Sequence, residues 1–169
     1  MTFVDPKGNP VEGTDIIGRS LGQYDRSQPS TIDVGNLSPN ETRTIEVIHR
    51  QRQLGKIFDV NFDGQKTDPI TITLLPTATI KGRLVDQDGV AIKGAGLLAS
   101  PNFKAKHRTG VFNTRACNPD GSFEFSDLST GCESYSLRTF GGAMFKSINE
   151  NIVVQPGEVV DLGDVKLKK

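Results

Sequence analysis

Two histidines are the side chains best suited to metal binding or acid–base chemistry in this chain of 169 residues. His49 and His107 each follow a predicted strand and precede an arginine. Metal sites bring histidines together at short spacings such as His-x-His or His-Glu-x-x-His, and neither pattern occurs. An iron site of two tyrosines and two histidines would also need Tyr24 and Tyr135, and these four residues are scattered along the chain. We therefore predict solvated basic turns at both histidines and no metal or other cofactor.

Four aspartates could in principle gather around a calcium ion: Asp86, Asp88, Asp120 and Asp127. The Asp-x-Asp-x-Asp-Gly pattern of a calcium loop is absent. Aspartates in turns routinely accept hydrogen bonds from nearby backbone amides. The sequence favours this turn role, with calcium as the alternative.

No group of residues has the spacing of a nucleophile and its base. The nucleophile motif Gly-x-Ser-x-Gly does not occur. Lys81 lies on a predicted first strand, from which a lysine can form an amide bond with an asparagine of the last strand. The predicted last strand, residues 159–168, contains no asparagine, so we expect no such crosslink. We predict that the chain is not an enzyme.

A basic segment beside an aromatic residue is the best candidate for a ligand loop. Carbohydrate sites usually use exposed aromatic faces, but the chain has no Trp, and aromatic residues are 7% of it. Phe103 and Phe140 are the aromatic residues expected beside loops. For both, a role in the core or as an anchor of the loop is favoured over a role in ligand binding. The candidate ligand residues are Phe103, Lys104, Lys106, His107 and Arg108.

Cys117 and Cys132 frame a predicted hairpin segment and could form a disulfide. If one five-residue strand separates them, their Cα atoms lie about 15 Å apart, beyond the ~7 Å that a disulfide spans. The chain could fold back at Cys132 and close that gap. The sequence leaves both states open.

The charge balance excludes several classes of partner. The chain has 20 Lys+Arg and 20 Asp+Glu, so its formal net charge is +0. This excludes nucleic-acid binding through bulk positive charge and a polybasic membrane-surface module. No apolar run approaches the ~18 residues of a membrane span, and no signal-peptide pattern begins the chain.

Alternation of apolar and polar residues is the dominant pattern in the elements that must position these side chains. It is clearest at residues 71–74, 122–126 and 164–168. Turn signals rich in Gly, Pro, Asn and Asp separate such runs, which is typical of an all-β sandwich or barrel. Residues 44–54 alternate in their first half, which favours a strand running into a basic turn over a short helix.

An internal repeat appears when the chain is shifted by 81 residues. Residues 3–13 then align with residues 84–94, with Val, Asp and both glycines in common. Weaker matches follow in the same order at 32–38 with 123–129 and at 72–74 with 165–167. We predict two tandem antiparallel Greek-key β-sandwiches, residues 1–76 and 77–169. The opening strand of the first is clipped to residues 2–4, so we expect a segment of a longer protein, with Met1 foreign to it.

The second copy resembles a known family. Residues 82–95 read Gly-Arg-Leu-Val-Asp-Gln-Asp-Gly-Val-Ala-Ile-Lys-Gly-Ala, similar to the opening hairpin of carboxypeptidase regulatory-like domains. Residues 120–131 resemble the family's second landmark, although Tyr135 and Leu137 come two residues late and Ala91 replaces the usual proline. The resemblance covers most of residues 78–168 and, more faintly, 2–75. It implies prealbumin-like sandwiches of seven or eight strands, often in tandem in secreted or envelope-attached bacterial proteins.

These observations predict a non-catalytic structural or interaction module of a larger secreted or envelope-associated bacterial protein. Its partners would be the neighbouring domains of that protein, without nucleic acid and without a membrane span in this segment. The alternative is a module that binds carbohydrate or peptide through its end loops. The hairpin further predicts a positive φ at Gly89 and, at Gly94, a position where a Cβ would clash.

Overall fold

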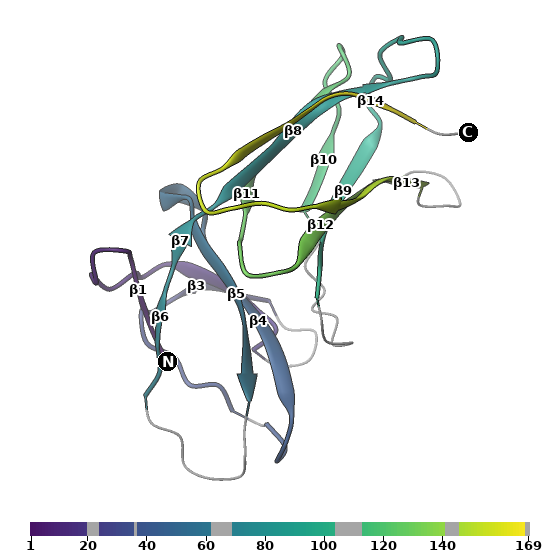
Figure 1. Ribbon diagram of the computed structural model, residues 1–169. Coiled ribbons are helices and arrows are strands. Elements are labelled where there is room, and N and C mark those ends of the chain that lie inside the picture. The colour runs from purple at the N-terminus through teal and green to yellow at the C-terminus, as the bar shows by residue number, and fades with distance from the viewer. Residues whose placement is uncertain (20–23, 36, 62–68, 104–112, 141–145, 168–169) are drawn as a thin grey trace. The chain divides into compact units, whose positions relative to one another are not determined.

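The computed structural model of the chain describes residues 1–19, 24–35, 37–61, 69–103, 113–140 and 146–167 (Figure 1). The described residues form two compact units. The first comprises residues 1–77 with Ser129–Gly131, and the second comprises residues 78–103, 113–128 and 132–167. Both units are β-sandwiches, so the predicted all-β fold class is confirmed.

The first unit contains seven strands and one 3₁₀ turn. A five-stranded sheet has the order β3-β2-β4-β5-β7, and β1 pairs with β6 in a second sheet. The 3₁₀ turn, Arg50–Arg52, directly follows β4, which confirms the predicted strand running into a basic turn. The strands are β1 (Thr2–Val4), β2 (Thr14–Ile17), β3 (Tyr24–Gln28), β4 (Thr42–His49), β5 (Leu54–Asn61), β6 (Thr71–Thr73) and β7 (Leu75–Pro76).

The second unit also contains seven described strands, arranged in one sheet of four and one of three. One sheet has the order β10-β9-β12-β13, which corresponds to β3-β2-β4-β5, and the other has the order β11-β8-β14. The strands are β8 (Ala78–Val85), β9 (Gly96–Asn102), β10 (Asn113–Ala116), β11 (Ser122–Leu128), β12 (Ser134–Phe140), β13 (Lys146–Ile152) and β14 (Val159–Lys166).

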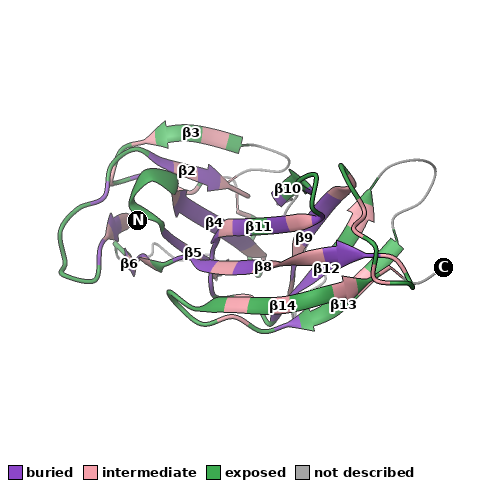
Figure 2. Ribbon diagram, turned by 90° about the horizontal axis from the view of Figure 1, so that it is seen from above, coloured by how far each residue is buried: buried purple, intermediate pink, exposed green. Residues whose placement is uncertain are grey.

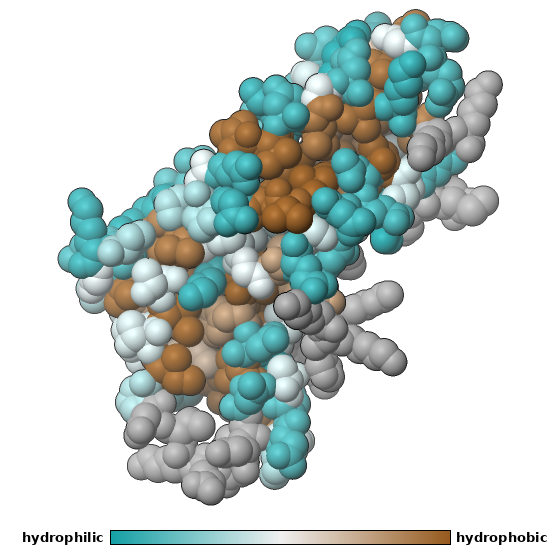
Figure 3. Space-filling view, viewed as in Figure 1, coloured by the Kyte–Doolittle hydropathy of each residue, from teal (hydrophilic) through white to brown (hydrophobic). Residues whose placement is uncertain are grey.

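Each unit has its own hydrophobic core, built from the apolar positions of alternating strands (Figure 2). Phe3, Ile45 and Leu74 are fully buried in the first core, and Phe125 and Tyr135 in the second. Apolar side chains also reach the surface of the second unit (Figure 3), where Val153 and Val159 are both 58% exposed. In β11 the alternation correctly predicts that Phe123 and Phe125 pack into the core while Glu124 faces solvent.

The same hairpin turn opens both units. Asp5 Oδ1 accepts hydrogen bonds from the N–H groups two and four residues further on, at 2.9 and 3.0 Å, and Asp86 Oδ1 does the same at 2.9 Å each. Gly8 and Gly89 have φ of +84° and +82°, so the predicted positive φ at Gly89 is confirmed. The predicted clash at Gly94 is wrong, because a Cβ there would meet nothing within 4 Å. Its φ of +64° is the reason for glycine.

Two expectations about strand pairing need correction. The units are not purely antiparallel, because β1 pairs with β6, and β8 with β14, in parallel. In the second unit the chain crosses from one sheet to the other between β13 and β14, so the last strand runs in the direction of the first. Residues 32–34, which the repeat aligns with residues 123–125 of β11, form no strand, and the preceding Thr31 makes an isolated bridge to Thr2.

Candidate functional site

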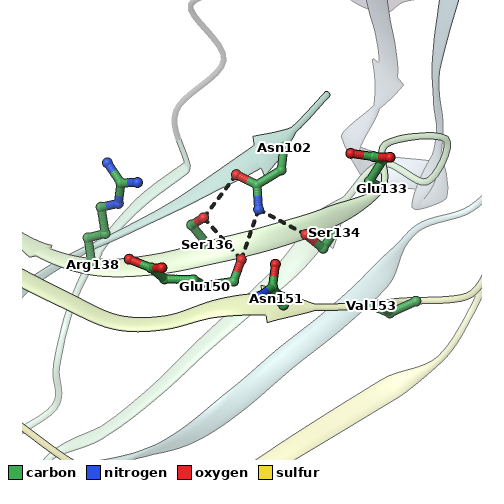
Figure 4. A pocket seen from close by; sticks show the side chains of 8 residues that line it. All are labelled: Asn102, Glu133, Ser134, Ser136, Arg138, Glu150, Asn151 and Val153. Carbon is green, nitrogen blue, oxygen red and sulfur yellow. Dashed lines mark hydrogen bonds between the residues drawn. The ribbon is translucent and has the colours of Figure 1, made fainter. Parts of the chain in front are cut away.

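A polar pocket of about 490 Å³ lies on the sheet formed by β9, β12 and β13 of the second unit (Figure 4). It is open to solvent on one side. Its lining side chains are all polar or charged apart from one valine. The lining residues are Asn102, Glu133, Ser134, Ser136, Arg138, Glu150, Asn151 and Val153.

The alternation of β12 creates the polar floor of this pocket. Tyr135 and Leu137 point into the core and are 0% and 1% exposed. Successive side chains of a strand point to opposite faces, so Ser134, Ser136 and Arg138 lie on the other face of the sheet. This Ser-x-Ser-x-Arg alternation is the sequence signal that could have located the pocket, which was not predicted.

Asn102 ties the three strands together at the pocket. Its Nδ2 donates hydrogen bonds to Ser134 Oγ at 2.9 Å and to the carbonyl oxygen of Glu150 at 3.0 Å. Its Oδ1 accepts a hydrogen bond from Ser136 Oγ at 2.9 Å, as the dashed lines in Figure 4 show. The carboxamide is therefore fully used in bracing β9 against β12 and β13.

Three charged side chains around this brace have no hydrogen bond or ion pair to another described side chain: Glu133, Arg138 and Glu150. Figure 4 shows Arg138 and Glu133 at opposite ends of the row, with Glu150 between them. Two carboxylates and one guanidinium can hold a polar ligand through charge-assisted hydrogen bonds. No lining residue is aromatic, so a sugar ring would find no stacking face.

The predicted ligand loop begins where this pocket begins. Phe103 follows the pocket residue Asn102 directly and is half-buried. Lys104, Lys106, His107 and Arg108 lie outside the described residues. The loop therefore remains a prediction, and the pocket at its start is the part of the candidate site that the structure describes.

The tyrosines and histidines considered for an iron site have other roles where they are described. Tyr24 donates a hydrogen bond from its hydroxyl to Asp15 at 2.7 Å. His49 Nδ1 accepts a hydrogen bond from the backbone N–H of Arg52 at 3.2 Å and so caps the 3₁₀ turn. The prediction for His49 was a solvated basic turn without a particular role for the imidazole, and the structure gives the imidazole this capping role. Tyr135 is fully buried in the core of the second unit.

Two of the aspartates considered for calcium bind their own turns. Besides Asp86, Asp120 accepts hydrogen bonds from the hydroxyl of Ser122 at 2.7 Å and from its N–H at 2.9 Å, which lower the pKa of Asp120. Asp127 instead forms an ion pair with Arg115 at 3.2 Å. Within the described ranges, no three His, Cys, Asp or Glu side chains are grouped to hold a metal ion.

Both cysteines are free thiols in the structure. Cys117 is buried, and this burial raises the pKa of its thiol. Lys81 lies 3.5 Å from Asp161 on the last strand, so the residue facing this lysine is an aspartate. These two side chains are 43% and 58% exposed, and an ion pair so exposed contributes little to stability.

Glu46 is a buried carboxylate that the alternating pattern placed in solvent. It is 2% exposed, and its neighbours Ile45 and Val47 are fully buried, so both faces of β4 are covered at this point. Burial raises the pKa of Glu46 to about 6, against the opposing influence of a hydrogen bond from Ser129 and the charge of Arg50.

The comparison with known proteins finds solved structures that resemble this chain at low sequence identity. No protein-family model and no curated protein matches the chain. A streptococcal ancillary pilin has 15% sequence identity and a TM-score of 0.38 over 99% of this chain and 61% of its own length. The Bacillus anthracis TIE protein has 14% identity and a TM-score of 0.40 over 98% of this chain and 33% of its own. A C-terminal fragment of the pilus adhesin SpaC from Lactobacillus rhamnosus GG has 10% identity and a TM-score of 0.37, with 99% and 97% covered. Because these sequence identities and TM-scores are low, the likeness carries no information on the function of the chain.

Proposed function

We propose that the chain is a non-catalytic structural module of a longer secreted or envelope-associated bacterial protein, in which it spaces or presents neighbouring domains. One observation carries this proposal. In the second unit β8 and β14 are parallel neighbours, with Val159 beside Thr79 and Lys166 beside Val85. The chain therefore enters the unit at one end of this pair and leaves at the opposite end. Such a module separates whatever precedes it from whatever follows it.

The two units are proposed to be copies of one carboxypeptidase regulatory-like domain, residues 1–76 and 77–169. The matching strand orders and the matching turns at Asp5 and Asp86 support this proposal. The extracytoplasmic location is proposed from the resemblance to this family. The described part of the chain contains no helix with the length and hydropathy of a membrane crossing.

Replacing the chain within the longer protein tests the spacing role. Residues 1–167 are deleted together, because Ser129–Gly131 belong to the first unit. This deletion should leave the flanking domains folded and active after purification, but should reduce their activity at the cell surface. An unrelated β-sandwich whose chain also enters and leaves at opposite ends should restore that activity. Failure of the unrelated module to restore it would show that specific recognition is required. Antibody labelling of intact cells tests the location.

A second candidate function is the binding of a glycan or peptide at the pocket. Glu133, Arg138 and Glu150, which have no ion pair or hydrogen bond to another described side chain, favour it, because charged groups can hold a polar ligand through charge-assisted hydrogen bonds. Binding on glycan and peptide arrays should then be lost in Arg138→Ala. The exposed Lys93→Ala variant serves as the matched control. Arrays without signal above background would eliminate this candidate.

A further inference from the structure

We propose that the second unit bears mechanical tension through the pairing of β8 with β14, and that this pairing is loaded in shear. The inference rests on the proposed spacing function, because a spacer between two attached domains is pulled from both of its ends. Tension that enters at Ala78 and leaves after Lys166 pulls the two strands in opposite directions along their length.

Loading in shear differs physically from peeling. In a parallel pair the hydrogen bonds are spaced evenly along the two strands. A force along the strands is shared by the whole ladder, so many bonds must break together. A force applied to both strands at the same end breaks the bonds one after another. Forced unfolding is governed by the unfolding rate. That rate is lower in shear, because many hydrogen bonds must break together, so the sheared strand pair withstands a given force for longer.

The ladder between these strands is closed by a backbone hydrogen bond at each end. At one end the N–H of Thr79 donates to the carbonyl oxygen of Glu158 at 2.8 Å. At the other end the N–H of Leu167 donates to the carbonyl oxygen of Val85 at 3.0 Å. The pairing thus extends over the full length of β8, and tension cannot act on a frayed end first.

A β-bulge holds the register of the two strands. Between Asp161 and Asp164, two residues of β14 lie opposite Gly82 alone. A Cβ on Gly82 would lie 2.9 Å from the ring of Phe123 and 3.1 Å from the carbonyl oxygen of Gly163. The bulge therefore fits only against a residue without a side chain. Sliding by one residue would press the bulge against Lys81 or Arg83, so steric contact opposes the motion that shear requires.

Two ion pairs flank the bulge and join the same strands. Lys81 lies 3.5 Å from Asp161, and Arg83 lies 3.3 Å from Asp164. Both pairs are exposed and add little to equilibrium stability. They are nevertheless stretched as soon as the strands slide, so they add resistance along the direction of the force.

Single-molecule force spectroscopy in two attachment geometries tests the inference. Both use the full chain in a background with Cys117→Ala and Cys132→Ala, and introduced cysteines serve as handles. In the first geometry the handles are at the two chain ends. The event of the second unit is recognised as the larger of two releases of chain, at most about 300 Å against about 260 Å for the first unit, at ~3.4 Å per residue. In the second they are at Asp88→Cys, which follows β8 in the chain, and at the C-terminus, which follows β14, and the last residues of these two strands are paired.

Pulling from the chain ends should require a several-fold higher force than pulling from the turn. Thermal melts of the two proteins should give equal melting temperatures, which checks that both fold alike. Gly82→Ala should lower the force from the chain ends and hardly change the force from the turn. Gly89→Ala strains the turn outside the ladder, so it should lower the melting temperature without this selective loss. Equal forces in the two geometries would overturn the inference.

The outcome is distinguishable from failure of the proposed function. Equal forces leave the spacing role intact, because spacing needs only that the chain enters and leaves at opposite ends. Conversely, if an unrelated sandwich fails to replace the chain at the cell surface, the spacing role fails. A higher force from the chain ends would still show that the strand pair resists shear.

Discussion

At the scale of single residues, turn aspartates and glycines do more to define this chain than any residue with catalytic potential. The carboxylate of Asp5 accepts hydrogen bonds from the backbone N–H groups of Asn9 and Lys7. It also forms an ion pair with Arg52 at 2.6 Å. The bond from the backbone of Asn9 is the largest influence that lowers the pKa of Asp5 to about 2. Asp86 has the same backbone bonds. The sequence could predict this role because aspartate two residues before a turn amide is a local pattern.

Replacement of either turn glycine should destabilise its own unit. Gly8→Val and Gly89→Val should each cost about 1–2 kcal/mol, because a β-branched side chain disfavours a positive φ. Lys93→Ala, an exposed change nearby, should stay within about 0.5 kcal/mol. Thermal melts of the three variants measure this. Equal melting temperatures for the glycine and lysine variants would contradict the turn assignment.

Glu46 should make the first unit less stable at neutral pH than at pH 5. Burial raises its pKa from 4.5 to about 6, so folding takes up a proton in this interval and stability falls as the pH rises from below 4.5 to above 6. The difference is at most about 2 kcal/mol, from 1.36 kcal/mol per pKa unit. The low pKa of Asp5 acts only at more acidic pH.

Glu46→Gln removes the titrating group and keeps a similar shape. Urea unfolding at pH 5 and pH 7, followed by hydrogen exchange in residues 42–61, should show a smaller pH dependence in the variant. The variant should also be more stable than the original at pH 7. An unchanged pH dependence would show that the burial of Glu46 is not its cause.

At the scale of strands, the sequence predicts the elements well and their partners less well. Alternation located β11 and β14, because apolar and polar faces repeat every two residues in any half-buried strand. It could not show that β14 runs parallel to β8, because alternation is the same in both directions. It also failed at Glu46, because a strand covered on both faces does not place its polar residues in water. The pocket was missed because it needs three strands that are far apart in the sequence.

Gly96 and Phe140 form a cross-strand pair in which the aromatic ring covers the glycine. They are partners in the pairing of β9 with β12, and a Cβ on Gly96 would lie 2.8 Å from the ring and from the carbonyl oxygen of Phe140. Gly96→Ala should therefore destabilise the second unit by about 1–3 kcal/mol, as other overpacking changes do. Denaturant unfolding measures the loss.

A double-mutant cycle identifies the ring as the cause. Phe140→Leu should cost little, because the ring is 38% exposed. The double variant should lose less than the sum of the single losses, since the smaller side chain leaves room for the added methyl group. Strict additivity would show that the backbone carbonyl oxygen, and not the ring, opposes the substitution.

At the scale of the whole molecule, the two cores have none of the described residues in common. Phe125→Ala empties a fully buried position of the second core and should cost about 3–5 kcal/mol, while Ile45→Ala should cost about 2–5 kcal/mol in the first. Peptide-resolved hydrogen exchange should show lost protection mainly in residues 78–167 for the first variant and in residues 1–61 for the second. Equal loss in both ranges for either variant would show one cooperative core.

The parallel pairing of first and last strands also bears on how such a protein can change its length over evolution. A unit that the chain enters at one end and leaves at the other can be copied in the gene without rearranging its neighbours. Each further copy adds the same increment of reach, so copy number acts as a ruler. On the proposed spacing function, a longer or shorter reach would follow from a change in the number of such units. What each unit would have to keep is the parallel pairing of its first and last strands.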